Sequence, residues 1–262
     1  MTLSHVVLTR LEKAAMDNGF DLEGVHDGAW IAFVSSHPSL RIWLGAPEGS
    51  LYVLALSRRE VCEALPDLGA PWTHPLPPGA CAARVLTDVA SLHRVIRRAF
   101  QLSRALPDAP LQVFLQKTTS LPRTTEAERL VVQRVGQDLF RNGLLDYWDG
   151  ACAVTGLAIP ELLRASHIKP WADCDTDAER LDVFNGFLLA PHLDAAFDRG
   201  FMTIDDTGRV IVSDLLDPAS RSVLGLDRPL SVHRLVDPHR AFLAWHLERV
   251  FRGTWPAVGA AS

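Results

Sequence analysis

The chain has 262 residues, of which 48% are hydrophobic and 22% charged, a composition typical of a globular protein with one large or two ordinary domains. Its net charge of −5 excludes a globally basic nucleic-acid-binding protein, so such a role requires a local concentration of cations. The four cysteines contain no C-x-x-C pair, which argues against a disulfide scaffold or a zinc ribbon and favours reduced thiols.

The sequence favours neither a membrane protein nor a secreted one. The N-terminus leads into a helix of mixed polarity rather than into the basic-then-apolar pattern of a secretory signal. No apolar run approaches the roughly 18 residues needed to span a membrane. We therefore expect a soluble, cytoplasmic protein.

The first 106 residues predict an α+β domain with a small antiparallel sheet. Apolar residues at helical spacing predict helices over residues 2–19 and 87–106. Between these helices lie three short apolar segments separated by turn residues, which is typical of an antiparallel meander: residues 30–35, 40–44 and 51–56.

Residues 107–122 are predicted to be a linker, and residues 123–262 to form a second domain. This domain begins with a long amphipathic helix, which the sequence predicts over residues 124–148. The sequence thus predicts two domains, each with its own elements.

Positive charge is concentrated between Arg84 and Arg141. This stretch contains ten Lys or Arg and only five Asp or Glu. Two interpretations remain open at this point. The cations either cover solvated helix faces or form a surface, including Arg97 and Arg98, that contacts DNA phosphates without sequence preference.

The segment from Cys152 to Val212 has the most specific pattern of the chain. Its strand-like runs are followed by a short helix that has a proline in its first turn and Gly200 at its end. The order is that of a ββα unit with a hairpin after it: strands over residues 152–155, 162–168 and 187–189, a polar loop over 173–182, a helix over 191–199 and a hairpin over 201–212.

This segment resembles the HNH endonucleases that have a ββα-metal core, in particular a bacterial restriction-type branch. The resemblance rests on four patterns: Cys-x-x-Thr-Gly at 152–156, a small residue before His-Ile-x-Pro-Trp at 166–171, Asn-Gly at 185–186 and Phe-Asp-x-Gly at 197–200. A helix over about residues 237–252 is similar to one that often closes such proteins. The resemblance implies an α+β chain whose ββα-metal nuclease domain is braced by flanking helices and acts on DNA with a divalent ion.

The resemblance also assigns two catalytic positions. His167 matches the general base, and a neutral imidazole can take a proton from the water that attacks a phosphodiester. Asn185 matches the middle residue of the motif, where its amide is expected to bridge the long loop and to orient the base. The alternatives are a histidine that only completes a strand end and an Asn-Gly pair that only forms a turn.

The third position differs from the family pattern, because it is Asp194 rather than a histidine. Asp198 follows four residues later, on the same face of the predicted helix. Two carboxylates at this spacing are suitable ligands for Mg²⁺, with Mn²⁺ as the alternative. Asp198 is alternatively a hydrogen-bonding residue at the helix end. His192, at the helix start, is expected to bind the metal, to bind phosphate or to cap the turn.

Cations close to the motif are candidates for phosphate contacts, which position a nuclease on DNA without reading its sequence. They are Lys169, Arg164 and Arg199, together with Arg180. Because such contacts specify little, we interpret the N-terminal domain as a DNA-targeting module whose ligand the sequence does not identify.

These features together predict a metal-dependent HNH endonuclease that hydrolyses DNA phosphodiester bonds in restriction or defence. One such site cuts one strand, so double-strand cleavage calls for a homodimer or for two successive nicks. Two alternatives stay open. One is a nuclease of the same chemistry that acts on RNA or on a mobile-element target, and the other is a catalytically silent DNA-binding regulator that retains the HNH fold.

Overall fold

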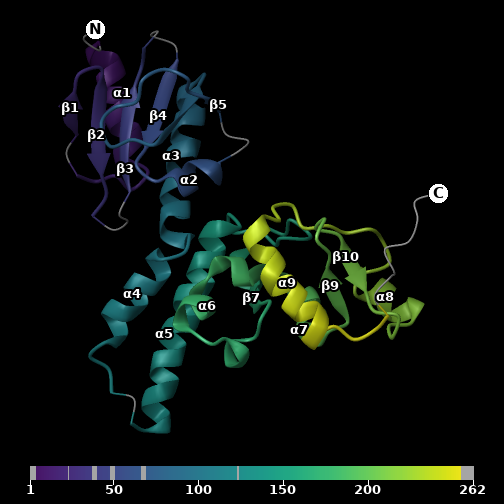
Figure 1. Cartoon of the computed structure of the whole chain (residues 1–262). Coiled ribbons are helices and arrows are strands. Elements are labelled where there is room, and N and C mark those ends of the chain that lie inside the picture. Colours follow the sequence, from purple (N-terminus) through teal and green to yellow (C-terminus); the bar gives the residue numbers. More distant parts are fainter. Residues whose placement is uncertain are drawn as a thin grey trace. The chain divides into compact units, whose positions relative to one another are not determined.

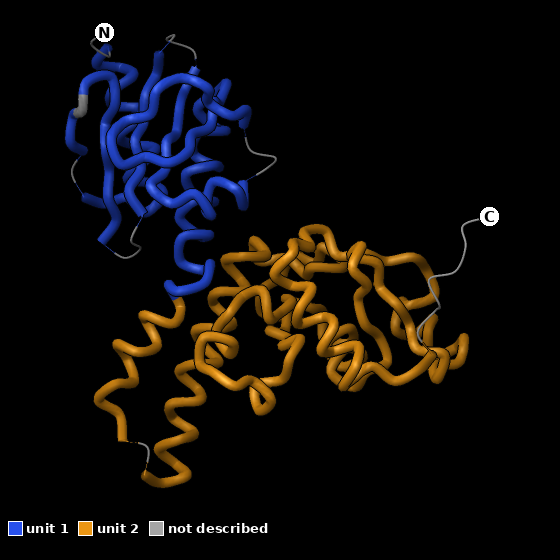
Figure 2. Tube along the Cα trace, in the orientation of Figure 1, with its two compact units in different colours: residues 1–109 blue, residues 110–262 orange. Residues whose placement is uncertain are grey.

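The structure is a computed structural model that describes residues 4–22, 24–36, 40–47, 51–65, 69–122 and 124–254. The chain divides into two compact units, residues 1–109 and residues 110–262 (Figure 2). In the described ranges, no helix has both the length and the apolar character needed to cross a membrane.

The first unit contains an antiparallel sheet of six strands in the order β1-β2-β3-β4-β6-β5. Its elements are α1 (His5–Met16), β1 (Val25–Asp27), β2 (Trp30–Val34), β3 (Arg41–Gly45), β4 (Tyr52–Leu56), α2 (Arg59–Glu63), β5 (Ala70–Pro71), β6 (Ala82–Leu86) and α3 (Val89–Ala105) (Figure 1). The α+β class and the antiparallel sheet are therefore confirmed. Strands β1 and β5 escape a sequence-based prediction because two or three residues are too few to show an alternating pattern.

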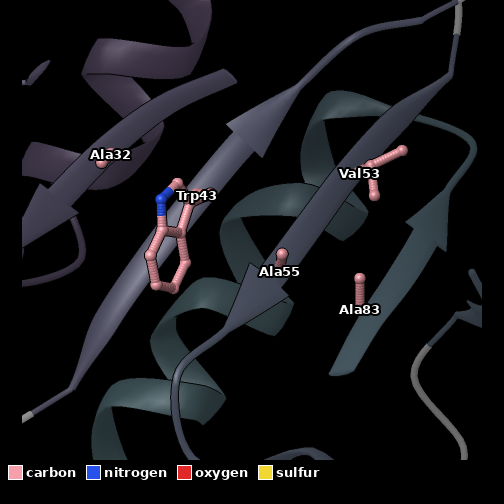
Figure 3. Close-up of a cluster of buried hydrophobic side chains, with 5 residues drawn as sticks. All are labelled: Ala32, Trp43, Val53, Ala55 and Ala83. Atoms are coloured by element: carbon pink, nitrogen blue, oxygen red, sulfur yellow. The ribbon is translucent and has the colours of Figure 1, made fainter. Parts of the chain in front are cut away.

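On one face of this sheet a buried tryptophan packs among small side chains, and Trp30, Trp72 and Leu76 pack against this cluster. The strand registers place one residue from each of four neighbouring strands in a row: Ala32, Trp43, Ala55 and Ala83. Figure 3 shows these side chains, with Val53, on the face turned away from the helices. The indole of Trp43 is only 2% exposed and fills the space that the alanines leave. This tryptophan is a core residue.

The second unit contains the ββα core, preceded and followed by helices (Figure 1). Its elements are α4 (Ala109–Thr118), α5 (Glu126–Tyr147), η1 (Pro160–Leu162), β7 (Arg164–His167), η2 (Trp171–Asp173), α6 (Asp177–Leu181), η3 (Val183–Asn185), β8 (Gly186–Leu189), α7 (Pro191–Asp198), β9 (Met202–Ile204), β10 (Val210–Val212), α8 (Pro218–Val223) and α9 (Asp237–Arg249). From residue 162 onward, the predicted order of two strands, a helix and a hairpin is confirmed.

Helix α5 packs against the β7–β8 hairpin. It begins with a capping box, in which Thr125 Oγ1 accepts the Glu128 N–H and the Glu128 carboxylate accepts the Thr125 N–H. Phe140 lies on its buried face, directly against Gly186 of β8. A Cβ on Gly186 would collide with the Phe140 ring, so the glycine allows the helix to approach the strand.

The expected linker over residues 107–122 contains helix α4. Three of its residues at helical spacing are buried: Pro110, Phe114 and Thr118. The division between the two units falls between residues 109 and 110, at the start of this helix. The prolines at each end of the segment favour a linker in the sequence, but the helix lies between them.

Two predictions within the ββα segment are wrong. The polar loop over 173–182 contains α6, because Thr176 Oγ1 accepts the Glu179 N–H and caps a helix that also has acidic residues in its first turn. Residues 152–155 form a turn rather than a strand, in which the Gly156 N–H donates to the Cys152 carbonyl at 3.0 Å. In both cases local hydrogen bonds outweigh the composition of the segment.

Candidate active site

The ββα unit sets the candidate catalytic residues on neighbouring elements. Strands β7 and β8 pair antiparallel, with His167 opposite Gly186. Helix α7 packs against β7. Pro191 begins this helix, and Gly200 follows its end with a φ of 74°, which favours glycine. Asn185 ends η3 and directly precedes β8, so the four candidate residues lie on β7, just before β8 and on α7.

The imidazole of His167 is held by a hydrogen bond and by two aromatic rings. Its Nε2 lies 3.0 Å from the Arg180 carbonyl oxygen, and since a carbonyl only accepts, Nε2 carries the proton. In the neutral ring, Nδ1 then has the lone pair. The ring stacks on Phe140 with centroids 3.7 Å apart and meets the Trp171 ring edge-on at 5.8 Å. Burial lowers the pKa of His167 to about 4, so this imidazole is unprotonated at neutral pH.

Asn185 is completely buried and ties together the loop that follows His167. Its Oδ1 accepts the Lys169 backbone N–H at 2.8 Å. Its Nδ2 donates to the carbonyl oxygens of Lys169 at 3.1 Å and of Glu179 at 3.0 Å. Arg180, whose carbonyl accepts from His167, comes directly after Glu179. Asn185 therefore fixes the backbone on both sides of the loop, next to the residue whose carbonyl accepts from His167.

Asp194 and Asp198 lie one turn apart on α7, next to Ser166 of β7. The Ser166 hydroxyl donates to Asp198 Oδ1 at 3.1 Å. Loss of hydration raises the pKa of both carboxyl groups, and the charge of Asp194 raises the pKa of Asp198 further. A hydrogen bond from Ser166 acts to lower the pKa of each carboxyl group. The charge of Arg164 also acts to lower the pKa of Asp194, and the charge of Arg199 that of Asp198. Two carboxylates that are partly desolvated and repel each other would be stabilised by a cation.

His167 and Asp198 line the same cavity, which has a volume of about 330 Å³. Trp171 also contributes to its wall, as do His246 of α9 and Val250, which follows that helix. A neutral imidazole and a carboxylate thus face one hollow that is otherwise partly apolar. The predicted base and one of the two predicted carboxylate ligands therefore line a common cavity.

His192 lies on another side of α7. Two successive residues along an α-helix differ by about 100°, so His192 points nearly opposite to Asp194. It lines a second, mostly apolar cavity of about 560 Å³, together with Phe201 and residues of α8. The structure therefore does not bring His192 to the carboxylate pair. In the part of the chain that the structure describes, no three His, Cys, Asp or Glu side chains are grouped to hold a metal ion.

Lys169 has a different environment from the one that the sequence suggests. The residue is only 9% exposed, and its ammonium forms ion pairs with Asp175 at 2.9 Å and with Glu179 at 3.0 Å. Hydrogen bonds to these two carboxylates raise the pKa of Lys169. Its charge is thus compensated within the loop, whereas Arg164 and Arg199 are exposed to solvent.

Arg180 also acts within this loop. Its guanidinium forms an ion pair with Asp177 at 3.0 Å and donates from Nε to the Trp171 carbonyl at 3.2 Å. Nη2 donates to the Cys174 carbonyl. These side-chain contacts hold the residue whose backbone carbonyl accepts from His167. The sequence suggests a phosphate contact for this arginine, but its side chain crosslinks the loop.

Arg97 and Arg98 belong to α3 in the first unit. Arg97 is exposed, with its Nε 3.3 Å from Asn18 Oδ1. Arg98 is only 6% exposed, so little of its side chain is accessible to solvent. Its helix turns it inward, where it lies within 3.4 Å of Gln101 Oε1. The basic stretch over 84–141 spans both units, and its Arg123 lies outside the described residues.

His246 lies outside the sequence motif but contributes to the candidate cavity. It is 1% exposed and lines the cavity of His167 and Asp198, although it lies far from the motif in the sequence. The one available signal is its position in a helix, three residues after the buried Leu243. That spacing indicates burial and not a place beside a particular cavity.

The ββα unit, with a histidine on its first strand and carboxylates on its helix, has the architecture of a ββα-metal nuclease core. Residues 152–205 match the family model described as HNH endonuclease. The predicted resemblance is thus confirmed for this segment, which carries the candidate residues His167, Asn185, Asp194 and Asp198. No curated protein matches the chain. The match assigns the segment to a nuclease family and leaves the first unit and α9 outside it.

Proposed function

We propose that this protein is a divalent-metal-dependent endonuclease that hydrolyses DNA phosphodiester bonds. The observation that carries the proposal is the cavity shared by His167 and Asp198, inside the segment that matches the HNH endonucleases. These side chains come from β7 and α7 and supply the two chemical groups that phosphodiester hydrolysis needs. One is a base for water, and the other is an oxygen ligand for a metal ion.

In the proposed reaction, Nδ1 of His167 takes a proton from water while the water oxygen attacks the phosphorus atom. The bond between phosphorus and the leaving oxygen breaks, and the leaving oxygen takes a proton from solvent. The hydrogen bond from Nε2 to the Arg180 carbonyl keeps Nδ1 available as the base and stabilises the imidazolium that forms. The lowered pKa keeps the ring unprotonated before the reaction.

Asp194 and Asp198 fit a hard divalent ion, Mg²⁺ first and Mn²⁺ as the alternative. Both offer oxygen donors, and the raised pKa of each supports this proposal, because a nearby cation would relieve an unfavourable negative charge. Two carboxylates are a sufficient protein contribution for Mg²⁺, which commonly keeps several waters and binds substrate phosphate. When bound, such an ion orients the phosphate and stabilises charge on the leaving oxygen.

DNA restriction or defence is the role that we propose for this activity, in the cytoplasm. A nuclease core that mainly contacts phosphates needs a second element to select its target. The first unit has its own sheet and its own core, so it is suited to be that targeting module. Cleavage of both strands then requires a homodimer or two successive nicks.

A plasmid-nicking assay tests this function. The full chain is incubated with Mg²⁺ or Mn²⁺ and supercoiled DNA that is unmodified, methylated or otherwise modified. We expect nicking of at least one substrate, and a loss of about 10²- to 10⁴-fold in His167→Ala, the range of general-base contributions.

Two outcomes contradict the proposal: no DNA is nicked with either metal, or His167→Ala nicks as fast as the unaltered protein. Cleavage of RNA alone, abolished by the same substitution, would correct the substrate and retain the catalytic assignment. Electrophoretic mobility shifts with uncut DNA identify a silent DNA-binding protein.

A further inference from the structure

The end of α9 contacts the end of α7 at several points, although α9 lies outside the matched segment. Nε2 of His246 lies 3.2 Å from the Phe197 carbonyl oxygen. After the helix, the Arg252 N–H donates to the Gly200 carbonyl at 2.8 Å. A Cβ on Gly200 would collide with the Val250 carbonyl oxygen, so the two backbones are as close as glycine allows.

His246 joins three elements through a single ring. Because the Phe197 carbonyl only accepts, Nε2 carries the proton, and Nδ1 therefore accepts from the Thr203 hydroxyl at 3.0 Å. The imidazole also stacks on the Phe197 ring, with centroids 3.9 Å apart and planes 6° apart. The ring is thus fixed against the last turn of α7 and against β9 at once.

The residue after Phe197 is Asp198, the carboxylate that faces the cavity of His167. A hydrogen bond and a ring contact at Phe197 orient the last turn of α7, and this turn determines where the Asp198 carboxylate lies. From the other side, the Ser166 hydroxyl contacts the carboxylate itself at 3.1 Å. We propose that His246 is a positioning residue that holds the last turn of α7 and so sets Asp198 in the cavity. The importance of this position for metal binding rests on the function proposed above.

The same helix offers a matched control. His239 lies two turns before His246 on α9 and is also completely buried. Its ring stacks on Phe187 of β8, with centroids 5.7 Å apart and planes 2° apart. Replacing His239 therefore removes a buried imidazole from α9 without removing the contacts of His246 to Phe197 and Thr203.

The test compares His246→Leu, His246→Gln and His239→Leu in the full chain. Amide hydrogen exchange is measured without metal at Gly200 and Phe201, whose N–H groups donate to carbonyls of α7. Mn²⁺ affinity is measured by titration calorimetry and nicking in the plasmid assay. We expect His246→Leu to accelerate exchange and to weaken Mn²⁺ binding at least about 10-fold, as for other groups that orient metal ligands. His246→Gln, which retains an N–H donor, should recover part of both, and His239→Leu should change neither.

The outcomes distinguish the positioning role of His246 from the proposed nuclease function. Unchanged exchange and Mn²⁺ affinity in His246→Leu overturn the positioning role, and so does an equal loss in His239→Leu, which would reflect general destabilisation. If the unaltered protein neither binds Mn²⁺ nor nicks DNA while exchange still accelerates in His246→Leu alone, the proposed function fails and the positioning of α7 by His246 is supported.

Discussion

The two sides of helix α7 differ in what they face. On one side, Asp198 contacts the Ser166 hydroxyl and lines the smaller cavity with His167. On the other side, His192 and Arg199 border the larger cavity, whose lining is mostly apolar. Both sides carry residue types that bind metals or phosphates. Of the two cavities, the smaller one places such a residue together with the neutral, half-buried imidazole of His167.

This difference shows that helix phase decides which ligand-type residues can act together. Asp194 and Asp198 are four positions apart and share a face, whereas His192 is two positions from Asp194 and does not. A count of candidate ligands in the sequence therefore overstates the site. The comparison predicts that substitutions on the side of α7 that faces the cavity of His167 affect catalysis. Substitutions on the side that faces the cavity of His192 should not.

The largest expected difference is between Asp198→Asn and His192→Asn. Replacing Asp198 removes a negative oxygen ligand and should reduce Mg²⁺-dependent nicking roughly 100-fold or more, since a metal ion contributes several kcal/mol and 1.4 kcal/mol is tenfold in rate. His192→Asn changes an exposed side chain on the other side and should retain the activity. Single-turnover nicking rates at saturating metal measure both. A strong loss in His192→Asn would show that the apolar side of α7 contributes to the reaction.

The next effect concerns the buried side-chain amide of Asn185, which holds the loop that follows His167. Asn185→Ala leaves the Lys169 N–H and two carbonyl groups without their partner, which should cost about 2 to 4 kcal/mol of unfolding free energy. Urea unfolding of the full chain measures this cost. Asn142 is an exposed asparagine on α5, and Asn142→Ala should stay within about 0.5 kcal/mol. A similar cost for both substitutions would contradict the role of Asn185 as the anchor of the loop.

The strands and helix of the ββα core can be predicted because their signals are local. A proline in the first turn and a glycine at the end define the helix as residues 191–199, and the structure has Pro191–Asp198. An apolar run predicts the second strand as 187–189, and β8 is Gly186–Leu189. His167 and Asn185 can be identified as candidates because the family motif contains these residue types in a fixed order.

The contacts that organise the site cannot be predicted in the same way, because they join residues far apart in the sequence. Lys169 is predicted as a phosphate contact because it is a cation near the motif. In the structure its ammonium forms ion pairs with Asp175 and Glu179. Helix α6 is hidden in a polar segment that has few apolar residues to show a period. His246 reaches the cavity from α9 only through the tertiary packing of α7 against that helix.

A smaller effect should appear in the pH dependence of stability. Burial lowers the pKa of three histidines of the second unit to about 4 each, namely His167, His239 and His246. In the unfolded chain they titrate near 6.5, so unfolding takes up protons between these values. Stability is therefore constant with respect to these groups above about pH 6.5 and falls as the pH decreases toward 4, by up to about 1.4 kcal/mol per pH unit for each histidine.

The unfolding free energy from urea titrations over this pH range measures the effect. His239→Phe removes one of the three groups and retains an aromatic ring. The slope of its unfolding free energy against pH should therefore be shallower, by the equivalent of about one proton taken up on unfolding. Asn142→Ala, which removes no titratable group, should keep the slope of the unaltered protein. An unchanged slope in His239→Phe would mean that this histidine does not remain neutral in the folded protein.

The smallest expected effect separates two exposed arginines that the sequence treats alike. Arg164 lies on β7 and lowers the pKa of Asp194; Arg199 lowers the pKa of Asp198 but lines the cavity of His192, on the other side of α7. Binding of DNA is measured at several salt concentrations in the His167→Ala background, so that the substrate stays intact. Arg164→Gln should lower the slope of log affinity against log salt by about 1, the signature of one lost phosphate contact, and Arg199→Gln should leave it unchanged. Equal reductions of the slope would show that DNA contacts both sides of α7. The difference between the side of Asp198 and the side of His192 would then apply to metal binding alone.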